Sequence, residues 1–242
     1  VIVALYVLYP LNSYTNRVLD VCLSCTYFPL RIAPLIIIST ILSQAFGGSA
    51  VREGAALQLG GSLGGTIGKW LKLDEYDQKV MIMCGMSAAF SALFGTPLTA
   101  TIFAMEVVSI GIMEYAALVP CAIASLIARE MADLVGARAE QFPVPASVAF
   151  DIKSGALIVL LALLCAAVSI LFCEVLHRTE RLFKSRMKNP WIRVVVGALL
   201  VIVLAKVLGT TDYLGAGMNI VERAIHGETE PAAFLLKIIF TA

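Results

Sequence analysis

The chain has 242 residues, of which 60% are hydrophobic and 14% are charged. Soluble globular domains carry roughly 25% charged and about 45–50% apolar residues, so this composition excludes an ordinary soluble domain and indicates a protein of the lipid bilayer. The formal net charge of +1 gives no reason to expect a nucleic acid or a strongly acidic partner.

The chain begins and ends inside apolar runs. Val1 to Leu8 carries no initiator methionine and no basic segment, and no signal-peptide cleavage site follows it. At the other end, Phe240-Thr241-Ala242 stops in the middle of an apolar segment. Because no polar linker divides the sequence, we expect a single transmembrane domain over residues 1–242, truncated at both ends.

Apolar segments recur along the chain, and several are shorter than the roughly 20 mainly apolar residues that a spanning helix needs. The short segments, bordered by Gly or Pro, are residues 30–46, 80–94 and 97–108. The segments that reach or approach spanning length are residues 114–134, 153–183 and 192–208. Short, interrupted segments are typical of helices that end at mid-membrane, where irregular backbone is tolerated only if it is buried or lines an aqueous cavity. The pattern predicts an all-α integral membrane protein with re-entrant helices.

The segment from Phe46 to Gly65 holds two charges, Arg52 and Glu53, in a glycine-rich apolar setting. A charge at mid-membrane is costly unless it is paired or hydrated, so such residues are functional candidates by default. Glu53 lies where the loop Gly47-Gly48-Ser49 is expected to turn into a helix that runs to about Leu71. The start of a helix exposes unpaired N–H groups and about half a positive charge, which makes an anion site without lysines.

Two interpretations of Glu53 are open at this point. A carboxylate tethered at a helix start competes with a free halide for the same N–H groups, and protonation would release it, so that anion and proton binding become linked. Alternatively, Glu53 caps the helix and pairs with Arg52.

The glycines of this helix recur at spacings of three and four and predict a small face for close packing. They are residues 54, 60, 61, 64, 65 and 68.

Basic residues predict the orientation in the membrane. The stretch from His177 to Lys188 holds five Lys or Arg and one Glu, and Arg193 follows it. The loop from Gly136 to Asp151 carries only Arg138 as a basic residue. By the positive-inside rule, we expect the 177–193 loop in the cytoplasm and the 136–151 loop outside.

The cysteines do not predict a metal site. They lie at positions 22, 25, 84, 121, 165 and 173. Cys22 and Cys25 have metal-ligand spacing, but no second pair follows. We expect the cysteines to pack as small apolar residues between helices, and we expect no metal or cofactor.

A catalytic set could in principle be formed by Ser49, Glu53 and His226. No nucleophile motif in the sequence supports an enzyme.

Gly47-Gly-Ser-Ala-Val-Arg-Glu-Gly54, with Gly60-Gly61 downstream, resembles the signature Gly-Arg-Glu-Gly-Pro region of the CLC chloride channel and transporter family. A second block, from Gly85 to Glu106, is similar to the family's next conserved segment and lies at the family's distance from the first. Tyr213-Leu-Gly-Ala-Gly217 fits as well, so the resemblance covers nearly the whole chain.

The resemblance implies a CLC-type inverted-repeat fold of tilted and re-entrant helices, and a homodimer in which each subunit holds its own anion pathway. It implies that Glu53 is the gating and proton-transferring glutamate, with an anion site at Arg52, Gly54, Ala55 and Asn16. The implied partners are a halide ion, either chloride or fluoride, and protons. The implied location is the lipid bilayer of a bacterial plasma membrane.

The sequence departs from the family pattern at several positions. Val51 stands where the family has Gly, Ala55 where it has Pro, and Val107 where chloride/proton exchangers carry a second glutamate. The usual Gly-Ser-Gly-Ile-Pro loop has its counterpart around Asn12 to Asn16. These departures resemble the fluoride/proton branch of the family, while chloride stays open. The alternative function is a different secondary transporter with an anion site at a helix terminus.

Overall fold

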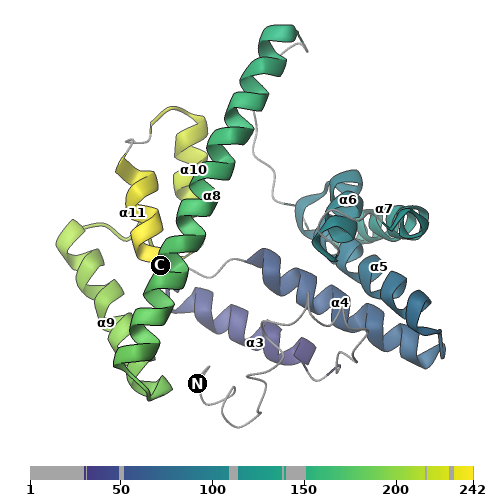
Figure 1. Cartoon of the computed structure of the whole chain (residues 1–242), viewed down its shortest axis with the longest axis horizontal. Coiled ribbons are helices and arrows are strands. Elements are labelled where there is room, and N and C mark those ends of the chain that lie inside the picture. The colour runs from purple at the N-terminus through teal and green to yellow at the C-terminus, as the bar shows by residue number, and fades with distance from the viewer. Residues whose placement is uncertain are drawn as a thin grey trace. The chain divides into compact units, whose positions relative to one another are not determined.

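The computed structural model describes residues 30, 32–48, 52–108, 114–137, 139, 151–215, 217–228 and 232–241. Within these ranges every regular element is a helix, which confirms the all-α prediction (Figure 1). The helices are α3 (Ile32–Ala45), α4 (Arg52–Trp70), α5 (Glu75–Phe94), α6 (Pro97–Val108), a short 3₁₀ helix (Tyr115–Ala117), α7 (Leu118–Val135), α8 (Ile152–Arg186), α9 (Pro190–Leu208), α10 (Met218–Ile225) and α11 (Ala232–Thr241).

Helix α5 is longer than its apolar pattern predicts, because it begins at Glu75 rather than Val80. The side chain of Asp74 accepts a hydrogen bond of 2.8 Å from the N–H of Asp77, and this cap stabilises a polar first turn. At the other end, Gly95 has a φ of +69° and ends the helix in the left-handed conformation that favours glycine. The caps therefore define the ends of this helix, whereas hydrophobicity alone marks only its apolar part.

The basic 177–193 region is mostly helix, so its prediction as a loop is wrong. Helix α8 continues through the basic stretch to Arg186, and only residues 187–189 separate it from α9. Ion pairs between residues four apart support the helix here: Glu174–Arg178 at 2.7 Å and Glu180–Lys184 at 2.6 Å. Pairs at this spacing lie on one face of a helix and favour the helical conformation. The cytoplasmic location of this region stays a prediction.

The chain forms two compact units, and the first holds α3 to α7. Helix α5 is central to this unit because it packs against α4, α6 and α7. A Cβ added at Gly60 would overlap the carbonyl oxygen of Gly85 on α5, and one added at Gly64 would overlap that of Met81. The predicted glycine face of α4 is therefore confirmed as the surface that admits α5. Gly54 is not part of it, since a Cβ there would meet nothing within 4 Å.

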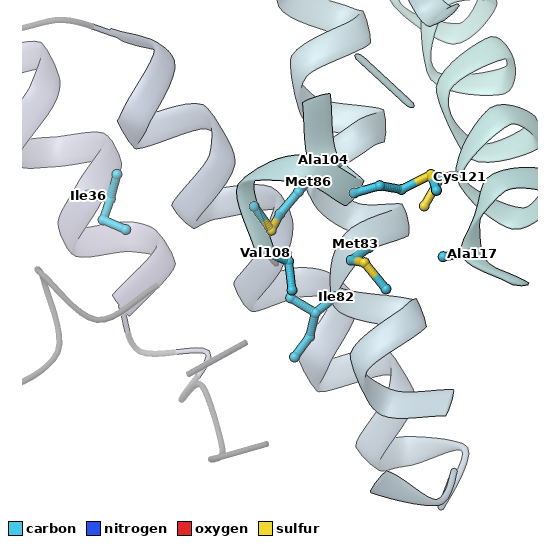
Figure 2. Close-up of a cluster of buried hydrophobic side chains, with 9 residues drawn as sticks. Ile36, Ile82, Met83, Met86, Ala104, Val108, Ala117 and Cys121 are labelled. Carbon is cyan, nitrogen blue, oxygen red and sulfur yellow. The ribbon is translucent and has the colours of Figure 1, made fainter. Parts of the chain in front are cut away.

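A cluster of buried apolar side chains joins the helices of the first unit (Figure 2). It comprises Ile36, Ile82, Met83, Met86, Ala104, Met105, Val108, Ala117 and Cys121. In a bilayer this core is stabilised by dense van der Waals packing rather than by the burial of apolar surface away from water, because lipid tails are as apolar as the side chains. The flexible methionines fill the irregular space between helices that approach closely at glycines.

The second unit holds α8 to α11 together with Gly47 and Gly48. Neither α8 nor α9 has a buried residue, and both are long and apolar enough to cross a membrane. The predicted third span, residues 114–134, forms α7 but does not join them, because Arg129, Glu130 and Asp133 lie in its second half. The single transmembrane domain over residues 1–242 stays a prediction.

Candidate functional site

The candidate site begins with the glycine segment between α3 and α4. Helix α3 ends at Ala45, and Gly47 follows with a φ of +76°, a conformation that favours glycine. The Gly47 carbonyl accepts a hydrogen bond of 3.1 Å from the N–H of Gly215. Residues 49–51 lie outside the described residues, and α4 begins at Arg52. The Gly47 turn belongs to the second unit, and α4, which begins five positions later in the chain, belongs to the first.

Glu53 lies in the first turn of α4, as predicted. Its side chain is half-buried, and its Oε2 atom is buried without a hydrogen-bond partner in the part of the chain that the structure describes. A buried polar atom without a partner costs about 1–3 kcal/mol, and more if it is charged. The first turn of a helix also presents free N–H groups and partial positive charge. A carboxyl group held there can exchange places with another anion or take up a proton.

The other predicted anion-binding residues are placed only in part. Arg52 is the first residue of α4, and its side chain lies outside what the structure describes. Gly54 is exposed, with open space where a side chain would stand, and Ala55 packs against the buried apolar cluster. Asn16 lies outside the described residues. An anion site at these four residues therefore stays a prediction. Of that predicted site, the structure describes the first turn of α4.

The sequence interpretation missed a lysine that supports the glycine segment. Lys237 of α11 donates hydrogen bonds to the carbonyl oxygens of Tyr213 (3.0 Å) and Gly215 (2.6 Å). Gly215 is the residue whose N–H binds the Gly47 carbonyl. The available signal was a single cation within the apolar run Ala232 to Ile239, which by itself marks a functional candidate in a membrane segment.

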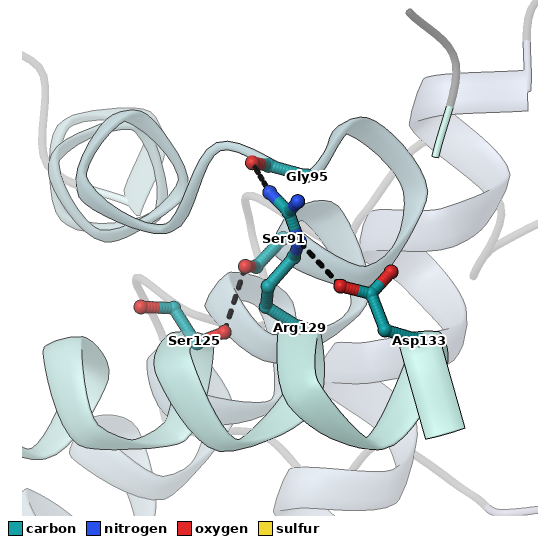
Figure 3. Close-up of polar contacts among 5 residues, drawn as sticks. All are labelled: Ser91, Gly95, Ser125, Arg129 and Asp133. Atoms are coloured by element: carbon teal, nitrogen blue, oxygen red, sulfur yellow. Dashed lines mark hydrogen bonds and ion pairs between the residues drawn. The ribbon is translucent and has the colours of Figure 1, made fainter. Parts of the chain in front are cut away.

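A polar network between α5 and α7 was also missed (Figure 3). Ser91 donates a hydrogen bond of 2.7 Å to the carbonyl of Ser125, and both serines are buried. Arg129 donates to the Gly95 carbonyl at the end of α5 and forms an ion pair of 3.1 Å with Asp133. The bonds of Ser91 and Arg129 to backbone carbonyls join α5 to α7, while the Arg129–Asp133 pair lies within α7. They give this network a structural role.

The position expected for a second proton-carrying glutamate is apolar. Val107 is half-buried and packs against the apolar cluster, and its neighbour Glu106 is exposed on α6. In the described residues, Glu53 is therefore the acidic group at the helix start, with no carboxyl group at Val107 to act beside it.

The cysteines behave in two ways. Cys84 and Cys121 pack between α5 and α7 with their sulfur atoms 3.8 Å apart, as expected. Cys165 and Cys173 are exposed, which corrects the expectation for them, because α8 buries none of its residues. Cys22 and Cys25 lie outside the described residues, and within those residues no cluster of three or more His, Cys, Asp or Glu could hold a metal ion.

Comparison with known protein families and sequences gives consistent matches. A sequence model of the family described as voltage gated chloride channel matches residues 11–242. A chloride/fluoride channel protein of Pseudomonas syringae pv. tomato is 31% identical over 219 residues, which are 88% of this chain and 48% of that protein. An uncharacterized protein of Methanocaldococcus jannaschii is 25% identical over 177 residues, 73% of this chain and 44% of that protein.

A solved structure agrees with these matches. The crystal structure of a CLC-type fluoride/proton antiporter superposes with a TM-score of 0.85 at 32% sequence identity, over 96% of this chain and 61% of that chain. The CLC-type fold expected from the signature residues is therefore confirmed. The chain spans about half the length of the curated relatives that it matches.

Proposed function

The chain belongs to the voltage-gated chloride channel family, a family of membrane-embedded proteins, and we propose that it is part of a halide transporter gated by Glu53. The single observation that carries this proposal is the position of Glu53. It is a half-buried carboxyl group in the first turn of α4, and one of its oxygens is buried without a partner among the described residues.

The proposed mechanism is competition between two anions for one helix start. The Glu53 carboxylate and a free halide both interact favourably with the N–H groups and the positive end of α4. This interaction is worth up to about 2 kcal/mol for a partly buried charge, so a halide can displace the side chain once a proton neutralises it. Protonation and halide entry then occur together, which couples proton movement to halide movement.

Fluoride exchanged for protons is the substrate that we favour, and chloride is the second candidate. Val107 and Ala55 depart from the pattern of the chloride/proton exchangers, and Val107 leaves no carboxyl group at the position of their second glutamate. The relative from Pseudomonas syringae is named a chloride/fluoride channel protein, and the matching crystal structure is of a fluoride/proton antiporter. We propose Glu53 as the principal proton carrier of this exchange.

Liposomes test the proposal directly. The protein expressed from its complete gene is reconstituted, the vesicles are loaded with fluoride or chloride, and halide efflux is recorded together with external pH. We expect fluoride efflux with proton movement in the opposite direction. If neither fluoride nor chloride leaves these liposomes faster than it leaves protein-free liposomes, halide transport is contradicted. That result would favour a secondary transporter of another anion.

We further propose that the protein is a homodimer of the bacterial plasma membrane, with one anion pathway in each subunit. Family membership supports this assembly. Its mass in detergent, measured by light scattering at several protein concentrations, should be that of two subunits. A single subunit at every concentration would contradict the dimer.

A further inference from the structure

A groove lies between α8, α9 and the end of α11, and all of its lining residues belong to the second unit. Its volume is about 660 Å³, within the roughly 300–1,000 Å³ that is typical of ligand pockets. Most of the lining is apolar and includes Val175, Phe183, Leu200, Leu204, Ile239 and Phe240. Gly197 of α9 also lines the groove, and a Cβ added there would meet nothing within 4 Å. Gly197 therefore faces open space rather than a closely packed helix.

The two long walls of this α8–α9 groove are helix faces on which the lining residues recur three or four positions apart. The wall on α8 includes Val175, Thr179 and Phe183, and the wall on α9 includes Arg193, Gly197, Val201 and Leu204. Arg193 lies in the first turn of α9, and Leu204 follows it by eleven positions. At a rise of about 1.5 Å per residue, this part of α9 is about 16 Å long. That length matches the roughly 15 Å of hydrocarbon in one leaflet of a bilayer.

The end of the groove beside the connection between α8 and α9 carries positive charge. Arg193 is partly buried there, and the acidic residue of the lining is Glu180. The Glu180 carboxylate forms an ion pair of 2.6 Å with Lys184, which neutralises it. Four cations of this region form no ion pair within the part of the chain that the structure describes: Arg181, Arg186, Lys188 and Arg193. The start of α9 adds partial positive charge, so this end of the groove attracts an anion.

We propose that the α8–α9 groove binds an anionic phospholipid, with the phosphate at Arg193 and one acyl chain along the apolar walls toward Leu204. Basic pockets between transmembrane helices on the cytoplasmic side bind anionic head groups, and the basic end of α8 is predicted to be cytoplasmic. A zwitterionic lipid offers the same acyl chains without net negative charge, so charge complementarity selects the anionic lipid. The inference concerns the second unit alone and does not depend on halide transport.

Lipid titration tests the contact with the head group. The protein from the complete gene is purified in detergent and titrated with phosphatidylglycerol or with zwitterionic phosphatidylcholine, and bound lipid is counted by native mass spectrometry. We expect phosphatidylglycerol to bind more tightly, and Arg193→Gln to weaken its binding about fivefold, the effect of one cation near a membrane surface. Arg193→Lys keeps the charge and should bind like the wild type. Lys206→Gln, which removes an exposed lysine of α9 outside the groove, is the matched control.

A crosslinking measurement identifies the occupant of the groove in a membrane. The protein from the complete gene, with a photoreactive benzophenone side chain at position 197, is reconstituted into vesicles of equal parts phosphatidylglycerol and phosphatidylcholine. Because Gly197 lines the groove and faces open space, we expect illumination to add the mass of one phosphatidylglycerol molecule. A crosslink to another segment of the same chain, or to a second copy, would show that protein covers the groove and would overturn the proposal.

The titration also has outcomes that contradict the proposal. Equal affinity for the two lipids would overturn the selection of an anionic head group. A loss in Arg193→Gln no greater than that in Lys206→Gln would overturn the place of the phosphate at Arg193. Gly197→Leu adds a side chain inside the groove, so unchanged phosphatidylglycerol binding in this variant would overturn the path of the acyl chain. The crosslinking measurement leaves Arg193 unchanged, and it therefore decides the proposal even if Arg193→Gln lowers the stability of the protein.

Discussion

Replacement of Glu53 by glutamine is the most direct perturbation of the proposed gate, because it keeps the shape of the side chain and removes its charge. A charge at a helix start contributes about 0.3–1 kcal/mol when exposed and up to about 2 kcal/mol when partly buried. Glu53 is half-buried, so the upper part of this range applies. Loss of about 1–2 kcal/mol from the competing carboxylate corresponds to a factor of roughly 5 to 30 in an equilibrium constant. Halide should bind Glu53→Gln more tightly by that factor.

Two assays measure this prediction on the protein from the complete gene. Isothermal calorimetry at neutral pH compares the halide dissociation constants of wild type and Glu53→Gln. Liposome efflux with simultaneous pH recording compares the proton movement of wild type and variant. Proton movement should be absent in Glu53→Gln, because the glutamine amide cannot take up and release a proton. Glu106→Gln is the control, since Glu106 is an exposed carboxylate on α6 and should leave both measurements unchanged.

One result would refute the reasoning. If Glu53→Gln retained proton-coupled exchange like that of the wild type and an unchanged halide affinity, Glu53 would be a structural cap of α4. The interpretation of Glu53 as a helix cap, left open by the sequence, would then be the correct one.

Three further predictions concern stability and orientation. Gly64→Ala should lower the free energy of unfolding by about 1–3 kcal/mol, seen as a lower Tm, because the added methyl group overlaps the Met81 carbonyl. Asp212, in the turn after α9, has its pKa held below the usual value by a hydrogen bond from Arg223. The stabilisation from this lowered pKa is full above the ordinary aspartate pKa of about 4 and is lost as the pH falls through the lowered pKa. Asp212→Asn should therefore lower Tm more at pH 7 than at pH 3. A cysteine placed at Ser185 in a cysteine-free background should resist a membrane-impermeant thiol reagent applied outside intact cells, because the basic end of α8 is predicted to be cytoplasmic.

Each of these has an outcome that contradicts it. Gly155→Ala adds a methyl group with nothing within 4 Å, so an equal loss of Tm there would remove the packing argument for Gly64. A Tm difference for Asp212→Asn that does not change with pH would mean that the ion pair contributes nothing. Ready labelling at Ser185 from outside would reverse the orientation.

The sequence by itself determined the features that depend on residues close together in the chain. The glycine spacing predicted the face of α4 on which α5 packs, and the glycine-rich loop predicted that Glu53 stands in the first turn of a helix. Apolar segments predicted helices near their observed positions, with errors where local capping or ion pairs extended a helix beyond its apolar part, as at Glu75 and Arg186. These features are readable because helix propensity, capping and packing periodicity are set within a few residues. The family resemblance added the expected roles.

Only the tertiary structure decided which distant groups meet. Lys237 could be recognised as an unusual cation in an apolar run, but its acceptors are carbonyl oxygens of a turn more than twenty positions away. The bond between Gly215 and Gly47 joins segments that are far apart in the chain, and the Ser91 and Ser125 pair joins two helices. Backbone carbonyl and N–H groups are present at almost every residue, so their pairing carries no signature in the residue types. The physical reason is that such contacts depend on how helices are placed against one another, which is settled by packing over the whole unit rather than by any local pattern.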